Sequence, residues 1–228
     1  KSYKGFKILL VYPNIQLCEM MPYSIGLLTA LLRREGFTVD LFDTTFYVDK
    51  VNNNYESFHD YVQEFDWKEK GRIFKTNIIK DFHKKIEEFD PNLICVSVVE
   101  NTYPTAKKMI NSLSQNMKKI PVMWGGVFAT FAPHLILKDN VGDYVCIGEG
   151  DDAIIEFCKR FHDGISVDNT PNFWVKKNGN IIKNKMGGLV NLEDSPIPDY
   201  SLFPDHAIHR VMQGKVRRTI GLETQRGC

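Results

Sequence analysis

The chain has 228 residues, of which 43% are hydrophobic and 25% are charged, as in an ordinary soluble globular protein. The formal net charge of +1 argues against a dedicated nucleic-acid binder, which usually carries a basic patch or stripe. No apolar run is long enough to span a bilayer and no signal peptide is apparent, so we expect neither a membrane nor a nucleic acid as partner. The five cysteines are odd in number and widely spaced, which favours a reduced, cytoplasmic protein.

Short apolar runs alternate with helical patterns along the first 165 residues. The runs expected to form strands are residues 7–12, 38–42, 93–98, 121–124 and 143–147. Helical periodicity is expected at residues 23–35, 74–89, 102–117 and 151–161. Three of the strands are nearly continuous in apolar residues, as strands buried on both faces must be. The alternation predicts a doubly wound α/β domain over residues 1–165, with a five-stranded parallel sheet in the flavodoxin-like (Rossmann-like) order 2-1-3-4-5.

The segment of residues 46–74 breaks this alternation. It stands between the second strand and its crossover helix, is rich in polar and aromatic residues, and is longer than a crossover requires. We interpret it as an insertion over the edge of the sheet at which ligands bind in this class of fold. A solvated surface elaboration explains its composition more simply than a substrate-gating lid.

The sequence changes character in its last third. An Asn178-Gly179 turn between two short β-like runs predicts a β-hairpin. Pro196 and Pro198 enforce an extended connector further on. Residues 166–215 are therefore expected to be a C-terminal hairpin and proline-containing linker rather than a second domain.

Three loops at the carboxyl ends of predicted strands carry residues suited to contacts through the main chain. They are Pro13-Asn14 after the first strand, Gly125-Gly126 after the fourth and Gly148-Glu149-Gly150 after the fifth. Glycine permits positive φ and lacks a Cβ, so a flat, bulky ligand can lie against the backbone. Tight turns alone would explain any one loop, whereas three at one sheet edge favour a ligand site. The loops match neither a dinucleotide fingerprint nor a Walker phosphate loop, which argues against ordinary nucleotides.

Two segments of the chain resemble motifs of cobalamin-binding domains of the methionine-synthase type, which combine Asp-x-His-x-x-Gly, Ser-x-Leu and Gly-Gly. Ser97-Val98-Val99 is close to the second motif and Gly125-Gly126 matches the third, but residues 14–21 contain no histidine for the first. This pattern resembles the cobalamin-binding domain that precedes a radical S-adenosylmethionine (SAM) domain, in a family whose members often lack that histidine. Further similar segments are residues 22–28, 124–130, 143–150 and 195–200.

The C-terminal residues extend the resemblance. Residues 216–222 are expected to form the first strand of a further domain, and the chain has no initiating methionine, so we expect a piece of a longer protein. Arg226-Gly227-Cys228 is similar to the beginning of the family's Arg-Gly-Cys-x-x-x-Cys-x-x-Cys motif. The resemblance implies that Cys228 is the first ligand of a 4Fe–4S cluster. It also implies that residues 216–228 open a SAM-binding barrel domain, the partner of the preceding domain.

The resemblance also implies which residues contact cobalamin. They are Pro13, Asn14, Ser97, Val98, Glu100, Gly125, Gly126, Phe128, Gly148, Glu149 and Gly150. The nucleotide tail would enter near Ser97 and the glycine pair, with the corrin over the strand ends. Glu149 would contact corrin amides or the ribose, or would serve only as a carboxylate at a helix N-terminus. Val127-Phe128 stand where many relatives have Pro-His, so an apolar contact would replace a polar one.

Without a histidine in the first loop, the lower face of the cobalt would be open, bound to water or covered by another residue. The local candidates are Tyr12, Asn14, Thr102 and Tyr103. His134 follows the glycine pair and is more simply interpreted as a structural histidine.

The intact protein that the resemblance implies is a radical SAM enzyme, most commonly a methyltransferase acting on an unreactive carbon. The present chain alone would then be inert, since it has one cluster cysteine and no barrel. A non-catalytic sensor domain of the same fold, or a cobalamin-responsive regulator, is an alternative. The N-terminal half of a nucleotide-sugar glycosyltransferase is another, although it would not predict the Arg-Gly-Cys segment. A phospho-receiver is disfavoured, because the first strand ends in Tyr12-Pro13-Asn14 rather than in an acidic cluster.

Overall fold

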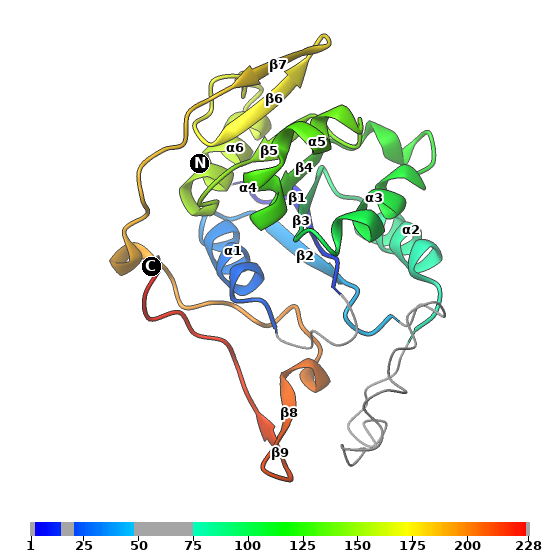
Figure 1. Ribbon diagram of the computed structural model, residues 1–228, viewed down its shortest axis with the longest axis vertical. Helices are drawn as coiled ribbons and strands as arrows, with labels where there is room; N and C mark the ends of the chain where they lie inside the picture. Colours follow the sequence, from blue (N-terminus) through cyan, green and yellow to red (C-terminus); the bar gives the residue numbers. More distant parts are fainter. Residues whose placement is uncertain (1–2, 15–20, 48–74, 227–228) are drawn as a thin grey trace.

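The computed structural model describes residues 3–14, 21–47 and 75–226. A seven-stranded sheet forms its centre (Figure 1). The first five strands are β1 (Lys7–Tyr12), β2 (Thr38–Asp43), β3 (Leu93–Ser97), β4 (Val122–Gly125) and β5 (Tyr144–Cys146). They are parallel and lie in the order β2-β1-β3-β4-β5. The predicted doubly wound, flavodoxin-like α/β fold is thereby confirmed.

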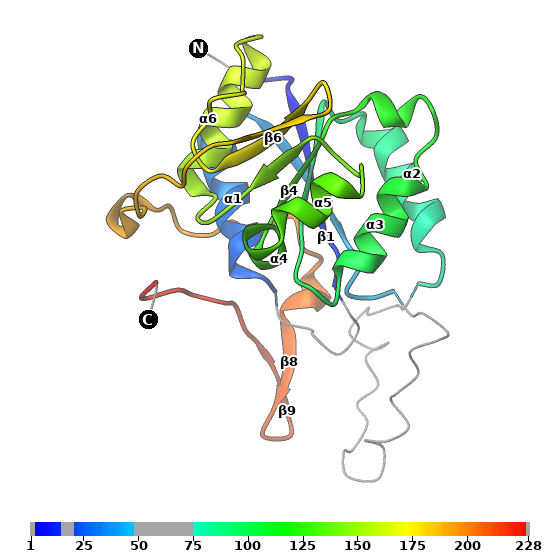
Figure 2. The same cartoon turned by 45° about the horizontal axis from the view of Figure 1, so that its top comes forward.

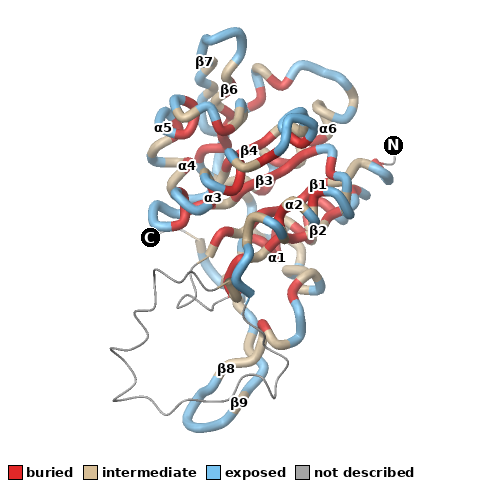
Figure 3. The backbone as a smooth tube through the Cα atoms, turned by 90° about the vertical axis from the view of Figure 1, so that its right-hand side faces the viewer, coloured by how far each residue is buried: buried red, intermediate tan, exposed pale blue. Residues whose placement is uncertain are grey.

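Helices cover both faces of the sheet, because successive side chains of a strand point to opposite sides. Ile8 and Leu10 of β1 belong to a layer that packs against α1 (Tyr23–Arg34) and α6 (Asp151–His162). Leu9 and Val11 belong to the opposite layer (Figures 1 and 2). The helices of that layer are α2 (Ile78–Phe89), α3 (Tyr103–Asn111), α4 (Val127–Phe131) and α5 (Pro133–Lys138). Figure 3 shows the resulting buried interior along the strands.

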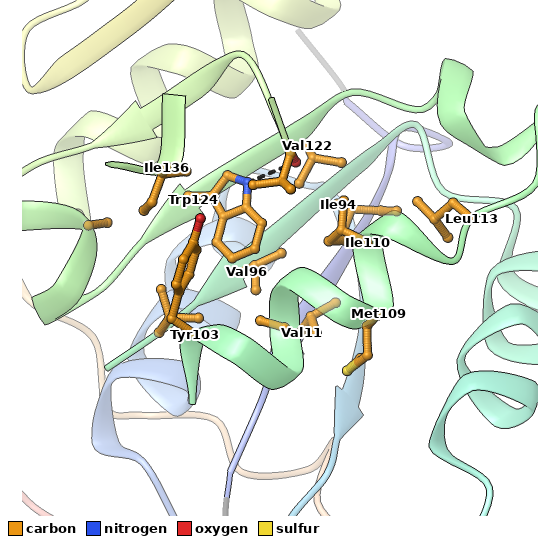
Figure 4. Close-up of a cluster of buried hydrophobic side chains, with 14 of the residues drawn as sticks. Val11, Ile94, Val96, Tyr103, Met109, Ile110, Leu113, Val122, Trp124 and Ile136 are labelled. Carbon is orange, nitrogen blue, oxygen red and sulfur yellow. Dashed lines mark hydrogen bonds between the residues drawn. The ribbon is translucent and has the colours of Figure 1, made fainter. Parts of the chain in front are cut away.

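Trp124 anchors the second layer directly before the predicted glycine pair. It is fully buried, and its Nε1 donates a hydrogen bond to the Val141 carbonyl at 3.1 Å (Figure 4). Tyr103 meets its ring edge-on at a centroid distance of 5.5 Å. Gly142 lies so close that a Cβ there would be 2.7 Å from the indole nitrogen. This packing fixes the carboxyl end of β4, where the predicted site begins.

Two helices are shorter than the periodicity predicted. The side chain of Asn77 accepts a hydrogen bond from the Lys80 N–H at 3.1 Å, so α2 begins at Ile78 rather than at residue 74. Ser112 follows the last residue of α3 and donates to the Met109 carbonyl at 2.6 Å. Serine thus competes with the helical backbone hydrogen bonds there, and only a 3₁₀ turn at Met117–Lys119 follows.

The predicted hairpin extends the sheet. Strands β6 (Phe173–Lys177) and β7 (Asn180–Lys183) are joined through Asn178 and Gly179, whose φ angles are 51° and 80°. Strand β6 pairs antiparallel with β5, so two antiparallel strands are added to the five parallel ones. The hairpin of the expected linker is therefore a structural part of the central sheet.

The connector after the hairpin returns along α1. The Asp199 N–H donates to the Gly26 carbonyl at 2.9 Å. A Cβ on Gly26 would lie 2.8 Å from the Tyr200 ring, so the glycine allows this close approach. The segments 22–28 and 195–200, both singled out in the sequence, thus meet in space.

A second, two-stranded sheet follows the connector. Strands β8 (His209–Met212) and β9 (Lys215–Arg218) pair antiparallel, so the strand predicted at 216–222 is realised only as far as Arg218. The predicted insertion lies, from residue 48 onward, outside the described residues. No helix in the described part of the chain is long and apolar enough to cross a membrane.

Candidate functional site

The carboxyl ends of β1, β3, β4 and β5 surround a cavity of about 440 Å³. This volume is typical of small-molecule sites. The N-terminal ends of α1 and α6 complete the wall. The predicted site residues that line it are Pro13, Asn14, Ser97, Val98, Gly125, Gly126, Gly148, Glu149 and Gly150. Folding therefore brings the three predicted loops to one cavity.

The deep part of the cavity lies between the sheet and helix α1. Leu10, Cys95, Met123 and Cys146 line it from the strands, and Ile25 lines it from α1. Burial raises the pKa of Cys146 to about 12 and that of Cys95 far above its usual range, so both thiols stay protonated. The floor is consequently neutral and apolar, and it suits a flat uncharged ring better than a phosphate.

The two glycines after β4 are needed for different reasons. Gly126 has a φ of +91°, and a Cβ there would lie 2.6 Å from the Val98 carbonyl oxygen. That carbonyl accepts a hydrogen bond from the Phe128 N–H at 3.1 Å, so the turn is tightly packed. Gly125 lines the cavity, and a Cβ there would have no atom within 4 Å. The Ser97 hydroxyl lies beside this pair and makes no hydrogen bond to any described residue.

The loop after β5 is held by a buried asparagine of the hairpin. Asn172 Nδ2 donates to the carbonyls of Ile147 and Glu149, both at 3.0 Å. Its Oδ1 accepts from the Gly187 N–H at 2.6 Å. The Glu149 carboxylate in turn accepts from the Val190 N–H at 2.7 Å. The hairpin and the residues after it thus set the shape of Gly148-Glu149-Gly150.

Asn172→Asp is expected to destabilise the protein by about 2 kcal/mol, because it removes two donated hydrogen bonds and faces two carbonyls with a carboxyl group. The melting temperature should fall by about 5 °C in thermal unfolding followed by circular dichroism. Asn178→Asp is the matched control, since Asn178 also has a positive φ but is exposed in the hairpin turn. Equal shifts in the two variants would contradict a holding role for Asn172.

Arg226 joins the cavity wall through a group of carboxylates. Its Nη1 lies 3.1 Å from Asp151 Oδ2 and 3.9 Å from Glu149 Oε2, and its Nη2 lies 2.9 Å from Glu223 Oε2. Burial alone would lower the pKa of Arg226, but hydrogen bonds to Glu223 and the neighbouring negative charges outweigh it and raise the pKa. Burial raises the pKa of Asp151, while Arg226 lowers it. The positive charge of Arg226 therefore stabilises the three neighbouring carboxylates in their ionised form.

Of the predicted site residues that the structure describes, two do not line the cavity. Glu100 is exposed at the end of the β3 loop. Phe128 packs on Tyr103, with ring centroids 4.6 Å apart, in the layer opposite the cavity floor. Cys228 lies outside the described residues, so the structure places no cluster ligand.

The candidates for the lower face of cobalt fall into two groups. Tyr12, Asn14 and Thr102 line the cavity. The Tyr103 hydroxyl instead donates to Asp139 Oδ2 at 2.7 Å, away from the cavity. His134 is not part of the wall, and none of the described residues that line the cavity is a histidine.

Sequence reasoning missed the polar side of the wall formed by Tyr23, Asp151 and Arg226. The acid at the first position of α6 was visible as a residue following Gly150. Arg226 stands 75 positions from Asp151, and no periodicity or spacing indicates that they meet. The contacts of Asn172 with the loop after β5 were likewise not predicted.

Comparison with known proteins agrees with this architecture. The radical SAM methyltransferase TsrM from Kitasatospora setae, solved with cobalamin and a 4Fe–4S cluster bound, is 21% identical. Its TM-score is 0.57, and the match covers 79% of this chain and 31% of that chain. The cobalamin-dependent SAM radical enzyme OxsB, solved with aqua-cobalamin and SAM, is 17% identical with a TM-score of 0.63, over 86% of this chain and 24% of that chain. These likenesses concern the fold, and the chain spans less than a third of either protein.

A family model decides the assignment. None of the curated proteins compared matches the chain. The model of the B12 binding domain matches residues 18–157, which is more than half of the 228 residues. The chain therefore belongs to the B12 binding domain family.

Proposed function

We propose that this chain binds cobalamin in the cavity at the carboxyl ends of β1, β3, β4 and β5, as part of a cobalamin-dependent radical SAM enzyme. The observation that carries the proposal is the shape of the cavity. It begins between glycine loops at the sheet edge and continues into an apolar layer under α1. This form suits a ligand with a broad macrocycle outside and a flat tail inside.

The residues present fit such a ligand. The neutral floor formed by Cys95, Met123 and Cys146 would take the uncharged ring of the nucleotide tail. The hydroxyl of Ser97 and the open backbone at Gly125 would contact the polar part of the tail. Cobalamin, when bound, supplies a cobalt ion that can carry and transfer a methyl group, while the protein positions it and limits side reactions. No described residue of the wall offers an imidazole to the cobalt.

The proposal extends to the whole protein. Residues 1–165 would be the cobalamin-binding domain, with an insertion at 46–74, residues 166–215 a hairpin and linker, and residues 216–228 the beginning of a SAM-binding barrel. Cys228 would be the first ligand of a 4Fe–4S cluster. The likeness in fold to the methyltransferase TsrM supports methyl transfer as the reaction, for which we propose an unreactive carbon as acceptor. This chain would be inert without the barrel, and the enzyme would be cytoplasmic.

The test is a titration of the 228-residue chain with hydroxocobalamin, followed by gel filtration and the visible spectrum of the protein peak. We expect corrin to co-elute with a spectrum that lacks histidine coordination. Cobinamide, which has the corrin but no nucleotide tail, is the matched control and should bind at least about tenfold more weakly. Failure to retain hydroxocobalamin, in this chain and in the full-length protein, would contradict the proposal. Equal affinity for cobinamide would contradict the placement of the tail.

A further inference from the structure

The segment of residues 219–226, which we term the strap, closes one side of the cavity. It leaves β9 and passes the N-terminal end of α1, where Gly221 lies close to Tyr23 (Figures 1 and 2). The Tyr200 hydroxyl donates to the Gly221 carbonyl at 2.6 Å, which fixes the strap near the N-terminal end of α1. Glu223 and Arg226 then form part of the cavity wall. The strap thus connects the cavity with the small β8–β9 hairpin.

Arg226 is the residue through which the strap holds the domain. It contacts the first residue of α6, Asp151, the loop residue Glu149 and the strap's own Glu223. Only 20% of the Arg226 side chain is exposed, and Asp151 is 6% exposed. Charged hydrogen bonds in so sheltered a place are stronger than exposed ion pairs. The guanidinium therefore links two elements of the domain to the strap.

The strap brings a cation to two carboxylates of the domain, those of Glu149 and Asp151. Three carboxylates, those of Glu149, Asp151 and Glu223, surround the one guanidinium among the described residues of the wall. Displacing Arg226 would leave Glu149 and Asp151 without the only cation that the described part of the wall contains. One oxygen of Asp151 is buried and has no hydrogen-bond partner among the described residues, which makes the remaining contact to Arg226 more important. Displacement of the strap would therefore cost Asp151 its hydrogen bond to Arg226.

We propose that Arg226 is a positioning residue that latches the strap over the cavity and slows the release of bound cobalamin. The inference rests on the proposed function. A ligand that fills the cavity lies against a wall that includes Arg226 and Glu223, so departure past that wall requires the contact between Arg226 and Asp151 to break. Truncation of one partner of a sheltered ion pair acts mainly on the dissociation rate. The latch also ties the loop after β5 to the residues that directly precede Cys228.

The test compares dissociation rates of hydroxocobalamin after rapid dilution, measured from the visible spectrum. Arg226→Gln is expected to raise the dissociation rate roughly tenfold while changing the association rate less than about twofold. Arg226→Lys should restore part of the slow release, since it keeps the charge but loses the fork of donors. Arg217→Gln is the matched control, because it removes the same charge from the exposed strand β9. Asp151→Asn should also accelerate release, and combining it with Arg226→Gln should add little.

Each remaining outcome has a definite meaning. Retention by the wild type together with equal release rates for wild type and Arg226→Gln would overturn the latch and leave the proposed function intact. Equal acceleration by Arg217→Gln, or strict additivity in the double variant, would also overturn it. No retention by the wild type, in this chain and in the full-length protein, would reject both. Because a variant could fold poorly, hydrogen exchange of the wild type is the second measurement: cobalamin should slow exchange in residues 219–226, and unchanged exchange would contradict the latch.

Discussion

Replacing Gly126 by alanine is expected to destabilise the protein by about 4 kcal/mol. The φ of +91° combined with a ψ of −176° is a conformation that only glycine adopts readily. The added Cβ would also meet the Val98 oxygen at 2.6 Å and the Val98 nitrogen at 2.9 Å, both of which are backbone atoms. The third strand would have to move away from the fourth, or the turn into α4 would have to open. Thermal unfolding should show a melting temperature lower by about 10 °C.

Gly188→Ala is the control for this variant, because Gly188 is exposed and a Cβ there would have no atom within 4 Å. Its melting temperature should stay within about 2 °C of the wild type. A Gly126→Ala protein as stable as the Gly188→Ala protein would mean that the turn after β4 relaxes without cost. In that case the glycine pair would not fix the edge of the cavity.

The parallel sheet could be predicted because each of its strands is recognised from a few consecutive residues. Each buried strand is a short apolar run, and each of the five parallel strands begins and ends within one residue of its predicted bounds. The ends of the helices α2 and α3 were predicted less accurately. Asn77 and Ser112 act there through single side-chain hydrogen bonds that the hydrophobic period does not contain.

The site could be predicted only where it consists of loops at strand ends. Topology brings such loops together in any parallel sheet, so Ser97 and Gly125 were found without knowledge of side-chain positions. Long-range polar contacts were not found. Asn172 reaches the loop after β5 because the hairpin adds to the sheet edge, and Arg226 reaches Asp151 because the strap returns past α1. Both depend on how separate elements pack, which a single sequence does not display.

Gly125→Val is expected to weaken hydroxocobalamin binding by at least about a hundredfold while leaving the fold intact. Gly125 pairs with Ser97 in the sheet and lines the cavity. A Cβ there meets nothing within 4 Å, and no positive φ opposes a side chain. Valine also has a higher β-strand propensity than glycine, so the stability of the protein should be retained or rise slightly. The new methyl groups would occupy space that the proposed cofactor needs against the backbone.

Variants of the two adjacent glycines distinguish the effect on folding stability from the effect on cofactor binding. Gly126→Ala should lose stability, whereas Gly125→Val should lose only the cofactor in the same gel-filtration assay. Gly125→Ala should weaken binding less than Gly125→Val, because the obstruction grows with the number of carbon atoms added. Gly188→Val serves as the control for β-branching, as that residue lies outside the cavity wall. Wild-type affinity in Gly125→Val would mean that the ligand does not approach the end of β4. The cavity would then take its ligand from the side of α1 and the strap alone.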